Sequence, residues 1–271
     1  MIKVSRKGEI VELKDKVAVI TGAASGIGKA TAQAMARLGA QVVVVDLNES
    51  GAQTVAEEIG GLAIGCDVGN EESVNAMVAE VEGKLGPVDV LFNNAGVATG
   101  GGPLNTPIDV WQSQWEINVM AHVYAVRAVL PSMLERESGY ILHTASMAGI
   151  LTTHGNLTYA ATKHAVVGIA EWLSITYHDK GIRVSCLAPL GVRTPMLGDT
   201  DSAFASQAAG PIKEPEDVAQ MVVDAIAEER FLILTDEIAQ TWMDRKNTDL
   251  ERWFGGMRRL QVKMDEYANK K

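Results

Sequence analysis

Short apolar runs alternate with longer segments of helical periodicity along most of the chain. The runs are rich in β-branched residues and lie at 16–21, 41–46, 88–92, 139–145, 182–188 and 231–234. Continuous apolar runs of this kind suit strands that are buried on both faces of a parallel sheet. The segments between them, such as 27–38 and 157–178, repeat apolar side chains at helical spacing. This alternation predicts an α/β protein with a doubly wound, seven-stranded parallel sheet and helices on both faces.

The alternation is continuous, with no linker rich in proline, glycine or serine and no internal repeat. We therefore expect a single domain over residues 13–235, preceded by an N-terminal extension at 1–12 and followed by a helical tail at 236–271. The pair Gly255-Gly256 is expected to interrupt the tail helix. We expect the aromatic side chains of the tail to dock on the body or on a neighbouring subunit rather than to cover a substrate.

A glycine-rich turn follows the first apolar run and opens the first periodic segment. The turn reads Gly22-Ala23-Ala24-Ser25-Gly26-Ile27-Gly28. A strand, a glycine turn and a helix in this order aim backbone N–H groups and the positive end of the helix dipole at an anion, as in the dinucleotide-binding Rossmann fold. A P-loop is disfavoured, because Ala23 and Ala30 stand where its first glycine and its hydroxyl belong. The spacing G-x-x-x-G-x-G also differs from the standard dinucleotide fingerprint.

The second apolar run ends in Asp46, close to the place where a ribose-binding carboxylate is expected. A carboxylate there accepts hydrogen bonds from ribose hydroxyls and repels a 2′-phosphate, and no arginine or lysine follows before Lys84. NAD is therefore the expected cofactor rather than NADP. The alternative for Asp46 is a structural one, in which it caps the following helix at 48–59.

Tyr159 and Lys163 stand at positions i and i+4, and Ser146 precedes them. These two positions share one face of a helix, so the Lys163 ammonium is expected beside the Tyr159 phenol. A nearby positive charge lowers a tyrosine pKa from about 10 toward the range that is useful to a general acid/base. Ser146 can then hold the substrate oxygen. Because the pair also occurs by chance on solvated helices, the interpretation depends on the nucleotide-binding half of the chain.

These motifs together resemble the short-chain dehydrogenase/reductase family. The matching residues follow the family's order and spacing: Thr21 to Gly28, Asp67-Val68, Asn93-Asn94-Ala95-Gly96, Asn118, Ser146 and Tyr159-Ala160-Ala161-Thr162-Lys163. The resemblance covers residues 13–235. It implies an NAD-dependent oxidoreductase that interconverts a secondary alcohol and its ketone by hydride transfer.

The resemblance assigns roles to the cofactor-binding residues. It places Gly22, Ser25, Gly26, Ile27 and Gly28 at the cofactor diphosphate, Asp46 at the adenosine ribose, Asp67 and Val68 at the adenine, Asn94, Ala95 and Gly96 at the middle of the nucleotide, and Val192 and Thr194 at the nicotinamide carboxamide. Asn93 is expected to be structural, because its amide can satisfy backbone groups at a strand end. The family usually has proline followed directly by glycine in the last of these loops, whereas this chain has Pro189-Leu190-Gly191. The backbone of that loop is therefore left open.

By the same resemblance, the catalytic set is Asn118, Ser146, Tyr159 and Lys163. The Tyr159 phenolate would take the alcohol proton as hydride leaves for NAD⁺, and Ser146 would steady the substrate oxygen. Lys163 would lower the tyrosine pKa and bind the nicotinamide ribose. Asn118 lies in a long helix expected at 106–134, where asparagine is a poor interior residue. In the family, an asparagine at this place bends the helix and holds a water molecule connected to the lysine.

The substrate is expected to lie between the catalytic set and two loops. Its contacts are expected from Ser146, Tyr159, His154 and Met196, and a pocket wall from Met147, Leu151 and His154. A mobile lid is expected at about 190–211, where the side chains of Met196, Leu197 and Phe204 favour an apolar or aromatic substrate.

Composition narrows the setting. With Lys+Arg 24 against Asp+Glu 34, the surface is acidic, which argues against a nucleic-acid partner. The first residues lack the apolar region of a signal peptide, and we expect no apolar stretch near the roughly 18 residues of a membrane span. Cys66 and Cys186 are expected to be reduced thiols in buried strands, so we expect a cytoplasmic protein. The histidines make no recognisable ligand pair, so no metal is expected.

The helices expected at 106–134 and 157–178 carry more apolar positions than one sheet face needs. In the short-chain family these two helices pair across a dimer axis and tetramers are common, so we expect a homo-oligomer, either a dimer or a homotetramer. Two other functions stay open: an NADPH-dependent carbonyl reductase, and a non-enzymatic NAD-binding redox sensor, because one fold hosts many roles. The intact catalytic set disfavours the sensor.

Overall fold

The computed structural model describes residues 12–197 and 210–268. The expected lid at 190–211 therefore falls partly outside the described residues, and Phe204 falls wholly outside them.

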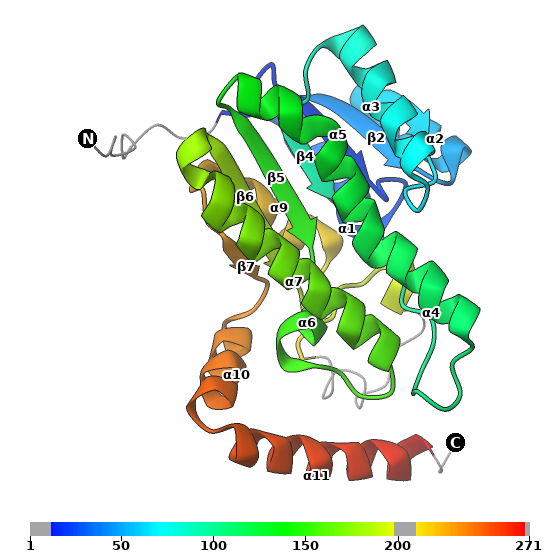
Figure 1. Ribbon diagram of the computed structural model, residues 1–271, viewed down its shortest axis with the longest axis vertical. Helices are drawn as coiled ribbons and strands as arrows, with labels where there is room; N and C mark the ends of the chain where they lie inside the picture. Colours follow the sequence, from blue (N-terminus) through cyan, green and yellow to red (C-terminus); the bar gives the residue numbers. More distant parts are fainter. Residues whose placement is uncertain (1–11, 198–209, 269–271) are drawn as a thin grey trace.

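The described strands form one parallel sheet in the order β3-β2-β1-β4-β5-β6-β7 (Figure 1). They are β1 (Val17–Thr21), β2 (Gln41–Asp46), β3 (Leu62–Gly65), β4 (Val90–Asn93), β5 (Gly139–Thr144), β6 (Ile182–Ala188) and β7 (Leu232–Leu234). Because β1 pairs with both β2 and β4, the strand order reverses beside β1. The predicted doubly wound, seven-stranded sheet is confirmed, and its topological switch point lies at the carboxyl ends of β1 and β4.

Helices cover both faces of the sheet. One face carries α1 (Gly26–Arg37), α2 (Glu49–Ile59) and α9 (Pro215–Ala227), and the other carries α3 (Glu71–Leu85), α5 (Ala121–Glu135) and α7 (Leu157–Tyr177). Shorter elements are α4 (Ile108–Trp115), the π-helix η1 (Glu116–Met120), α6 (Ala148–Leu151), and the 3₁₀ turns η2 (His178–Lys180) and η3 (Pro195–Leu197).

Alternate residues of each strand pack under opposite helical layers. In β1, Val17 and Val19 belong to the core beneath α3, α5 and α7, whereas Ala18 and Ile20 belong to the core beneath α1, α2 and α9. Each fully buried valine or isoleucine stabilises the fold by about 1.5–3 kcal/mol, so a strand that is apolar on both faces is strongly held in the centre of the sheet. This double burial explains why the strands read as continuous apolar runs.

The expected helix at 106–134 is realised as α4, η1 and α5, which follow one another without a break. This combined helix, Ile108–Glu135, is long and apolar enough to cross a membrane by length and composition alone, with a mean hydropathy of 1.3 in its 18-residue window. The expectation that no apolar stretch approaches that length is therefore wrong. The core helix of a soluble protein passes the same test, and 44% of this window is buried against the rest of the protein.

The tail forms two helices, α10 (Glu237–Thr248) and α11 (Leu250–Ala268). The expected break at Gly255-Gly256 is wrong, because α11 runs through both glycines. A glycine costs about 1 kcal/mol relative to alanine in a helix, which is too little to stop a helix that is otherwise well formed. In Figure 1, α11 lies across the end of the molecule, beyond α6 and α10.

The two cysteines are both buried and free. Cys186 lies in β6, as expected, but Cys66 follows the last residue of β3 rather than lying in the strand. The Ser73 hydroxyl donates a hydrogen bond to the Cys66 sulfur at 3.3 Å, and burial raises the pKa of both thiols. Neither thiol is therefore set up as a reactive thiolate.

Candidate active site

A large cleft of about 1030 Å³ lies along the carboxyl ends of the parallel strands. Most of the residues that the sequence assigned to cofactor and substrate line this cleft. They are Gly22, Ser25, Gly26, Ile27, Asp46, Asp67, Val68, Asn94, Ala95, Gly96, Ser146, His154, Tyr159, Lys163, Val192, Thr194 and Met196. Two assigned residues, Gly28 and Asn118, are not among the lining residues and lie behind its wall.

The glycine turn is shaped by close backbone contacts. Gly22 and Gly26 have φ values of +64° and +54°, a region that side chains other than glycine rarely adopt. A Cβ on Gly28 would stand 2.3 Å from the Gly22 carbonyl oxygen, so Gly28 holds the turn closed rather than facing the cleft. The turn therefore presents backbone at the N-terminus of α1, where N–H groups can receive an anion.

Asp46 connects the glycine turn to the start of α2. One carboxylate oxygen accepts a hydrogen bond from the Ala24 N–H at 3.0 Å, and the other accepts one from the Asn48 N–H at 3.0 Å. The helix cap itself is Asn48, whose side chain accepts the Gly51 N–H. Asp46 is therefore not the cap that the structural alternative assumed, although it does order the local backbone, and it also faces the cleft.

Asn94, just after β4, forms side-chain hydrogen bonds to the ends of the two neighbouring strands, β1 and β5. Its side-chain N–H group donates to the Thr21 carbonyl at 3.0 Å, and its amide oxygen accepts the Thr144 hydroxyl at 3.2 Å. The Thr21 hydroxyl in turn accepts the N–H groups of Asn94 and Ala95. These bonds fix the loop after β4 against the glycine turn.

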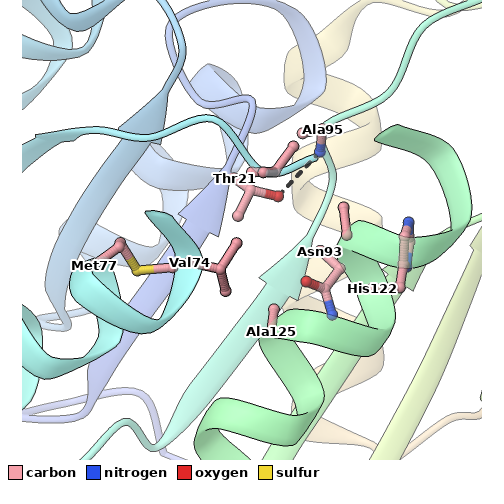
Figure 2. Close-up of a pocket in the computed structure, with 9 residues that line it drawn as sticks. Thr21, Val74, Met77, Asn93, Ala95, His122 and Ala125 are labelled. Carbon is pink, nitrogen blue, oxygen red and sulfur yellow. Dashed lines mark hydrogen bonds between the residues drawn. The ribbon is translucent and has the colours of Figure 1, made fainter. Parts of the chain in front are cut away.

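Behind this loop lies a small closed pocket between β1, β4, α3 and α5, which Figure 2 shows with the Thr21–Ala95 hydrogen bond. It has no room for a water molecule. Asn93 and His122 line it, and in the described chain the Asn93 side-chain nitrogen and the His122 Nε2 have no hydrogen-bond partner. The expectation that the Asn93 amide satisfies backbone groups is thus not met on its nitrogen side.

The helix that carries Tyr159 begins at a well-formed cap. Asn156 accepts the Tyr159 N–H at 2.9 Å through its side-chain oxygen, so α7 starts two residues before the tyrosine and places Tyr159 and Lys163 on successive turns. Ser146 lies just beyond β5, and its hydroxyl accepts the Ala148 N–H at 3.1 Å. The three side chains meet in the cleft.

The pKa shift of Tyr159 differs from the one expected for a tyrosine beside Lys163. The Lys163 ammonium lies 5.7 Å from the centre of the Tyr159 ring, and it donates a hydrogen bond to the Thr144 carbonyl at 2.8 Å. Burial raises the pKa of Tyr159, and hydrogen bonding with Ser146 offsets part of that rise. Burial also lowers the pKa of Lys163 to about 8. The expected lowering of the tyrosine pKa by Lys163 is not found, because desolvation of the phenolate by burial is the largest effect on this side chain.

Asn118 sits in the π-helical turn and is completely buried. Its amide group donates to the Val97 carbonyl and accepts the Val97 N–H, each at 2.8 Å, and also donates to the Thr162 hydroxyl at 3.1 Å. The expected bend in the helix is therefore a π-turn, a feature that is frequent at functional sites. A Cβ on Gly96 would lie 3.2 Å from the Asn118 amide oxygen and 3.4 Å from the Lys163 nitrogen, so these two polar groups approach one point.

A buried pair of histidines lies near Lys163, and no pattern in the sequence predicts it. His122 follows Asn118 by one helical turn on α5, and His143 precedes Thr144 on β5. Their Nδ1 atoms are 2.8 Å apart and their rings stack with centres 5.0 Å apart. Burial lowers the pKa of both rings, that of His143 to about 3, so the pair is neutral at physiological pH. One ring must then donate its Nδ1–H to the other.

The far end of the cleft is built by the tail. Its lining residues are Trp242 and Arg245 from α10 and Trp253, Met257 and Leu260 from α11. Trp242 and Trp253 also pack with Met147 and Leu151, so the tail aromatics dock on the body and face the cleft at once. The expectation of docking alone is therefore incomplete.

The unusual Leu190 takes part in this docking. Its side chain packs in the same apolar cluster as Trp242, and a Cβ on Gly210 would meet both Leu190 and Trp242 within 3.3 Å. The backbone of the loop is held by the Leu190 N–H, which donates to the Thr235 hydroxyl at 3.1 Å. The departure from the family's usual proline–glycine sequence thus supplies a side chain on which the tail rests.

A doubly wound parallel sheet with a glycine turn and a cleft at its switch point is the arrangement of Rossmann-type nucleotide-binding proteins. Within that class, the chain belongs to the short chain dehydrogenase family, whose family model matches residues 16–204. The match ends before α9 and the tail, which therefore lie outside it.

Relatives and solved structures agree with this assignment. The chain is 34% identical over 233 residues to a cyclohexanol dehydrogenase of Acinetobacter sp. (strain SE19), which covers 82% of this chain and 92% of that protein. It is 35% identical over 224 residues to a 2,5-dichloro-2,5-cyclohexadiene-1,4-diol dehydrogenase of Sphingobium indicum, covering 78% of this chain and 90% of the relative. A short chain dehydrogenase/reductase from Burkholderia phymatum in complex with NAD has a TM-score of 0.81 and 31% identity, covering 89% of this chain and 96% of that one.

Proposed function

We propose that this protein is an NAD-dependent oxidoreductase that interconverts a secondary alcohol and its ketone. The observation that carries the proposal is that Ser146, Tyr159 and Lys163 line the same continuous cleft as the glycine turn and Asp46. A nucleotide at one end of this cleft and an alcohol at the other would lie side by side in one continuous space.

The residues at the nucleotide end suit a dinucleotide. The glycine turn offers backbone N–H groups and the positive end of α1 to a diphosphate, and no side chain of Gly22 or Gly26 stands in the way. Asp46 lines the cleft at the end of β2, where its carboxylate would accept ribose hydroxyls and repel a 2′-phosphate. This favours NAD over NADP. When bound, the oxidised nicotinamide supplies the acceptor for the hydride.

The chain's own residues would handle the proton. The Tyr159 oxygen, in its ionised form, would take the hydroxyl proton of the alcohol, while the Ser146 hydroxyl would hold the same substrate oxygen. The carbinol carbon loses its hydrogen as hydride, so the products are a ketone, the reduced cofactor and a proton. Because burial raises the pKa of Tyr159, this side chain is protonated at neutral pH, which suits it to donate a proton in ketone reduction. Alcohol oxidation is then expected to quicken as the pH rises.

The substrate end of the cleft favours an apolar body. Its walls include Met147, Leu151, Trp242, Trp253 and Met257. Two relatives are named as dehydrogenases of a cyclohexanol and of a chlorinated cyclohexadiene diol. Both names are consistent with an alicyclic secondary alcohol as the substrate class of this chain.

We also propose a homo-oligomer. On α7, Trp172 and Ile175 are 58% and 84% exposed, and on α4 Trp115 is 41% exposed. Large apolar side chains of this kind, gathered on two helices that the family uses for pairing, favour burial against a second copy. Light scattering that finds a monomer at micromolar concentration would contradict this.

Turnover with purified protein tests the proposed function. Wild type is mixed with NAD⁺ or NADP⁺ and a panel of cyclic secondary alcohols, and reduced nicotinamide is followed by its absorbance. We expect turnover that is faster with NAD⁺, increases with pH and falls by at least about 100-fold in Tyr159→Phe, because a general acid/base contributes about 10²–10⁴-fold. Faster turnover with NADP⁺ would favour the carbonyl reductase alternative. Cofactor binding without turnover of any alcohol or ketone would favour the redox sensor.

A further inference from the structure

A short connection between Ser146 and Tyr159 forms one wall of the cleft. It consists of α6 and the loop that follows, in which Thr152, Thr153 and His154 line the cleft. Thr152 has a φ of +75° and a ψ of 177°, a conformation that is almost confined to glycine. A threonine in this conformation is strained, and it persists only where the surrounding structure holds it in place. Contacts around this wall must therefore hold Thr152 against its own preference.

The loop does not hold this conformation by itself. Among the described residues, no hydrogen bond involves the backbone of Thr152, Thr153, His154 or Gly155. At its far end the loop is anchored by Asn156, whose side chain caps α7. The restraint on Thr152 must therefore come from side chains and from α6, which precedes it.

The tail restrains α6 through Lys246 on α10. The Lys246 ammonium donates a hydrogen bond to the Ile150 carbonyl, one of those that the C-terminus of a helix leaves without an intrahelical partner. Burial lowers the pKa of Lys246, so the ammonium has lost part of its water, and the carbonyl replaces that water. Trp242, also on α10, belongs to the same apolar cluster as Leu151. Helix α10 therefore fixes the end of α6 directly before Thr152.

The restraint on α6 extends to Ser146. The Ser146 carbonyl accepts the Gly149 N–H at 2.8 Å, and the Ser146 hydroxyl accepts the Ala148 N–H at 3.1 Å. The turn that Lys246 holds at its end thus begins on Ser146. A shift of this turn would move the hydroxyl that faces the cleft.

A second contact from the tail holds the loop itself. Helix α11 lies across the end of the molecule beyond α6 (Figure 1), and its Gln261 amide oxygen accepts a hydrogen bond from His154 Nδ1 at 2.7 Å. The Gln261 amide nitrogen donates to an Asp265 carboxylate oxygen at 2.7 Å, which leaves the amide oxygen to face the histidine. Within the described chain, residues 152–155 form no other hydrogen bond. The loop is therefore tied to the tail rather than to the sheet.

We propose that Lys246 and Gln261 are positioning residues, which hold the wall that begins at Ser146, including the strained Thr152, in its cleft-forming conformation. This inference rests on the proposed function, in which Ser146 holds the substrate oxygen. Lys246 acts through α6 on Ser146, and Gln261 acts through His154 on the substrate wall, so neither side chain touches the reacting atoms. Both residues lie in the tail, outside the segment that the family model matches.

Substitutions at the two contacts test the role in turnover. Lys246→Met keeps an unbranched side chain but removes the donor. We expect its kcat/KM with NAD⁺ and a cyclic alcohol to fall about 10-fold or more, mainly in kcat, because Ser146 is displaced. Lys246→Arg keeps a donor and should recover most of this loss, whereas Gln261→Leu should act mainly on KM. The matched control is Lys263→Met on the exposed face of α11, which should change both constants by less than about 2-fold.

A second background tests the strain itself. Glycine adopts the Thr152 conformation without strain, so Thr152→Gly should lessen the dependence on the tail contacts. We expect Lys246→Met to lower kcat/KM by about 10-fold in the wild-type background and by less than about 3-fold in the Thr152→Gly background. Each comparison is made within one background, so any effect of Thr152→Gly on substrate binding cancels. A contact that only stabilises the tail would give the same factor in both backgrounds.

Hydrogen exchange measures the same contacts without a substrate. The N–H groups of residues 149–151 are hydrogen-bonded within the turn that begins at Ser146. In the full-length protein their exchange should quicken about 10-fold in Lys246→Met, and less strongly in Gln261→Leu, while the strand β2 stays protected. In the Thr152→Gly background, Lys246→Met should quicken this exchange by a smaller factor.

The outcomes separate this inference from the proposed function. If exchange and turnover in Lys246→Met and Gln261→Leu match wild type, or if Thr152→Gly leaves the Lys246→Met factor unchanged, the positioning role is wrong while the dehydrogenase stands. If wild type binds NADH but oxidises no cyclic alcohol, the proposed function loses its support, and the exchange measurement still decides the positioning role. If Lys246→Met also loses protection in β2, its unfolding is general, and the same measurements on Gln261→Leu decide.

Discussion

The two ends of the cleft are built in different ways. At the nucleotide end, the wall consists of strand-end loops within the segment that the family model matches. Backbone atoms and short side chains form most of its surface. At the substrate end, much of the wall consists of long side chains from α10 and α11, outside that segment. Helix α11 has no fully buried residue among those described, so it adds little to the core. The nucleotide end is fixed by the fold, whereas the substrate end is an addition to it.

The difference has an energetic side. At the nucleotide end, the hydrogen bonds between Thr21, Asn94 and Ala95 also join the end of β1 to the loop after β4. A change there should therefore disturb both cofactor binding and the stability of the fold. At the substrate end, Trp253 and His154 line the cleft without belonging to the sheet, so a change there alters the cleft wall without opening the core between the sheet and its helices. Substitutions at the two ends should therefore have different signatures.

The largest effect is expected from Gly28→Ala at the nucleotide end. The new Cβ would stand 2.3 Å from the Gly22 carbonyl oxygen and 2.7 Å from the Asn94 side-chain nitrogen, so the backbone of the turn must shift. We expect a loss of about 3 kcal/mol in the free energy of unfolding, typical of severe overpacking, together with a loss of NADH affinity. Urea unfolding and NADH fluorescence titration measure the two.

Gly83→Ala is the matched control. Gly83 lies inside α3 with no atom within 4 Å of its added Cβ, so alanine should stabilise the protein by about 0.5–1 kcal/mol and leave NADH binding unchanged. A Gly28→Ala protein as stable as this control would show that the turn does not depend on the close contact.

An intermediate loss in the free energy of unfolding is expected when the pH is lowered, because of the buried His122–His143 pair. The pKa values of His122 and His143 are lowered in the folded state, so in mild acid the unfolded chain binds protons at these two residues and the folded chain does not. Their contribution is therefore present above pH 6.5 and is lost as the pH falls toward about 3, the pKa of His143. The expected slope is about 1.4 kcal/mol per pH unit for each histidine that titrates.

Urea unfolding between pH 7.5 and 5.5 measures this slope. The variant His143→Asn keeps a polar side chain that can accept or donate but does not titrate, so its stability should depend less on pH by about 1.4 kcal/mol per pH unit below 6.5. Identical pH profiles for wild type and His143→Asn would contradict the account of the pair.

The smallest effect on the fold is expected from removing α11, which forms part of the cleft wall at the substrate end. A chain that ends at Thr248 lacks α11 and with it Trp253, Met257 and Leu260 of the cleft wall. We expect NADH affinity to change by less than about 2-fold, and KM for cyclic alcohols to rise about 10-fold, because a lost apolar wall costs on the order of 1–2 kcal/mol of binding. Steady-state kinetics and NADH titration measure both. A loss of NADH binding would mean that the two ends of the cleft are not independent.

Much of the fold could be predicted from the sequence because its strands are buried on both faces. β2 and β6 begin and end at the residues that the runs indicate, since double burial favours apolar side chains along most of each strand, although β6 also contains Arg183 and the buried Ser185. The sequence also indicated which residues gather at one place, because most of the assigned residues line one cleft, while their roles in binding and catalysis stay predictions. Their common placement follows from a fold that brings strand ends together.

Other features depend on three-dimensional context that no local pattern contains. The direction of the Tyr159 pKa shift follows from burial, which outweighs the hydrogen bond with Ser146, and spacing alone could not reveal it. The His122–His143 contact joins a helix to a strand across the core, so no short-range signal marks it. The continuous α11 shows the same limit, because Gly255-Gly256 reads as a break by propensity.

The most direct test of the central claim is to follow the hydrogen that is transferred. An alcohol deuterated at its carbinol carbon is incubated with NAD⁺ and the protein, and the mass of the reduced cofactor is measured. We predict reduced cofactor that carries one deuterium with wild type, and at least about 100-fold less with Tyr159→Phe, which should still bind NADH. Label transfer at the same rate in the variant, or reduced cofactor without deuterium, would contradict the assignment of Tyr159 as the acid/base of a direct hydride transfer.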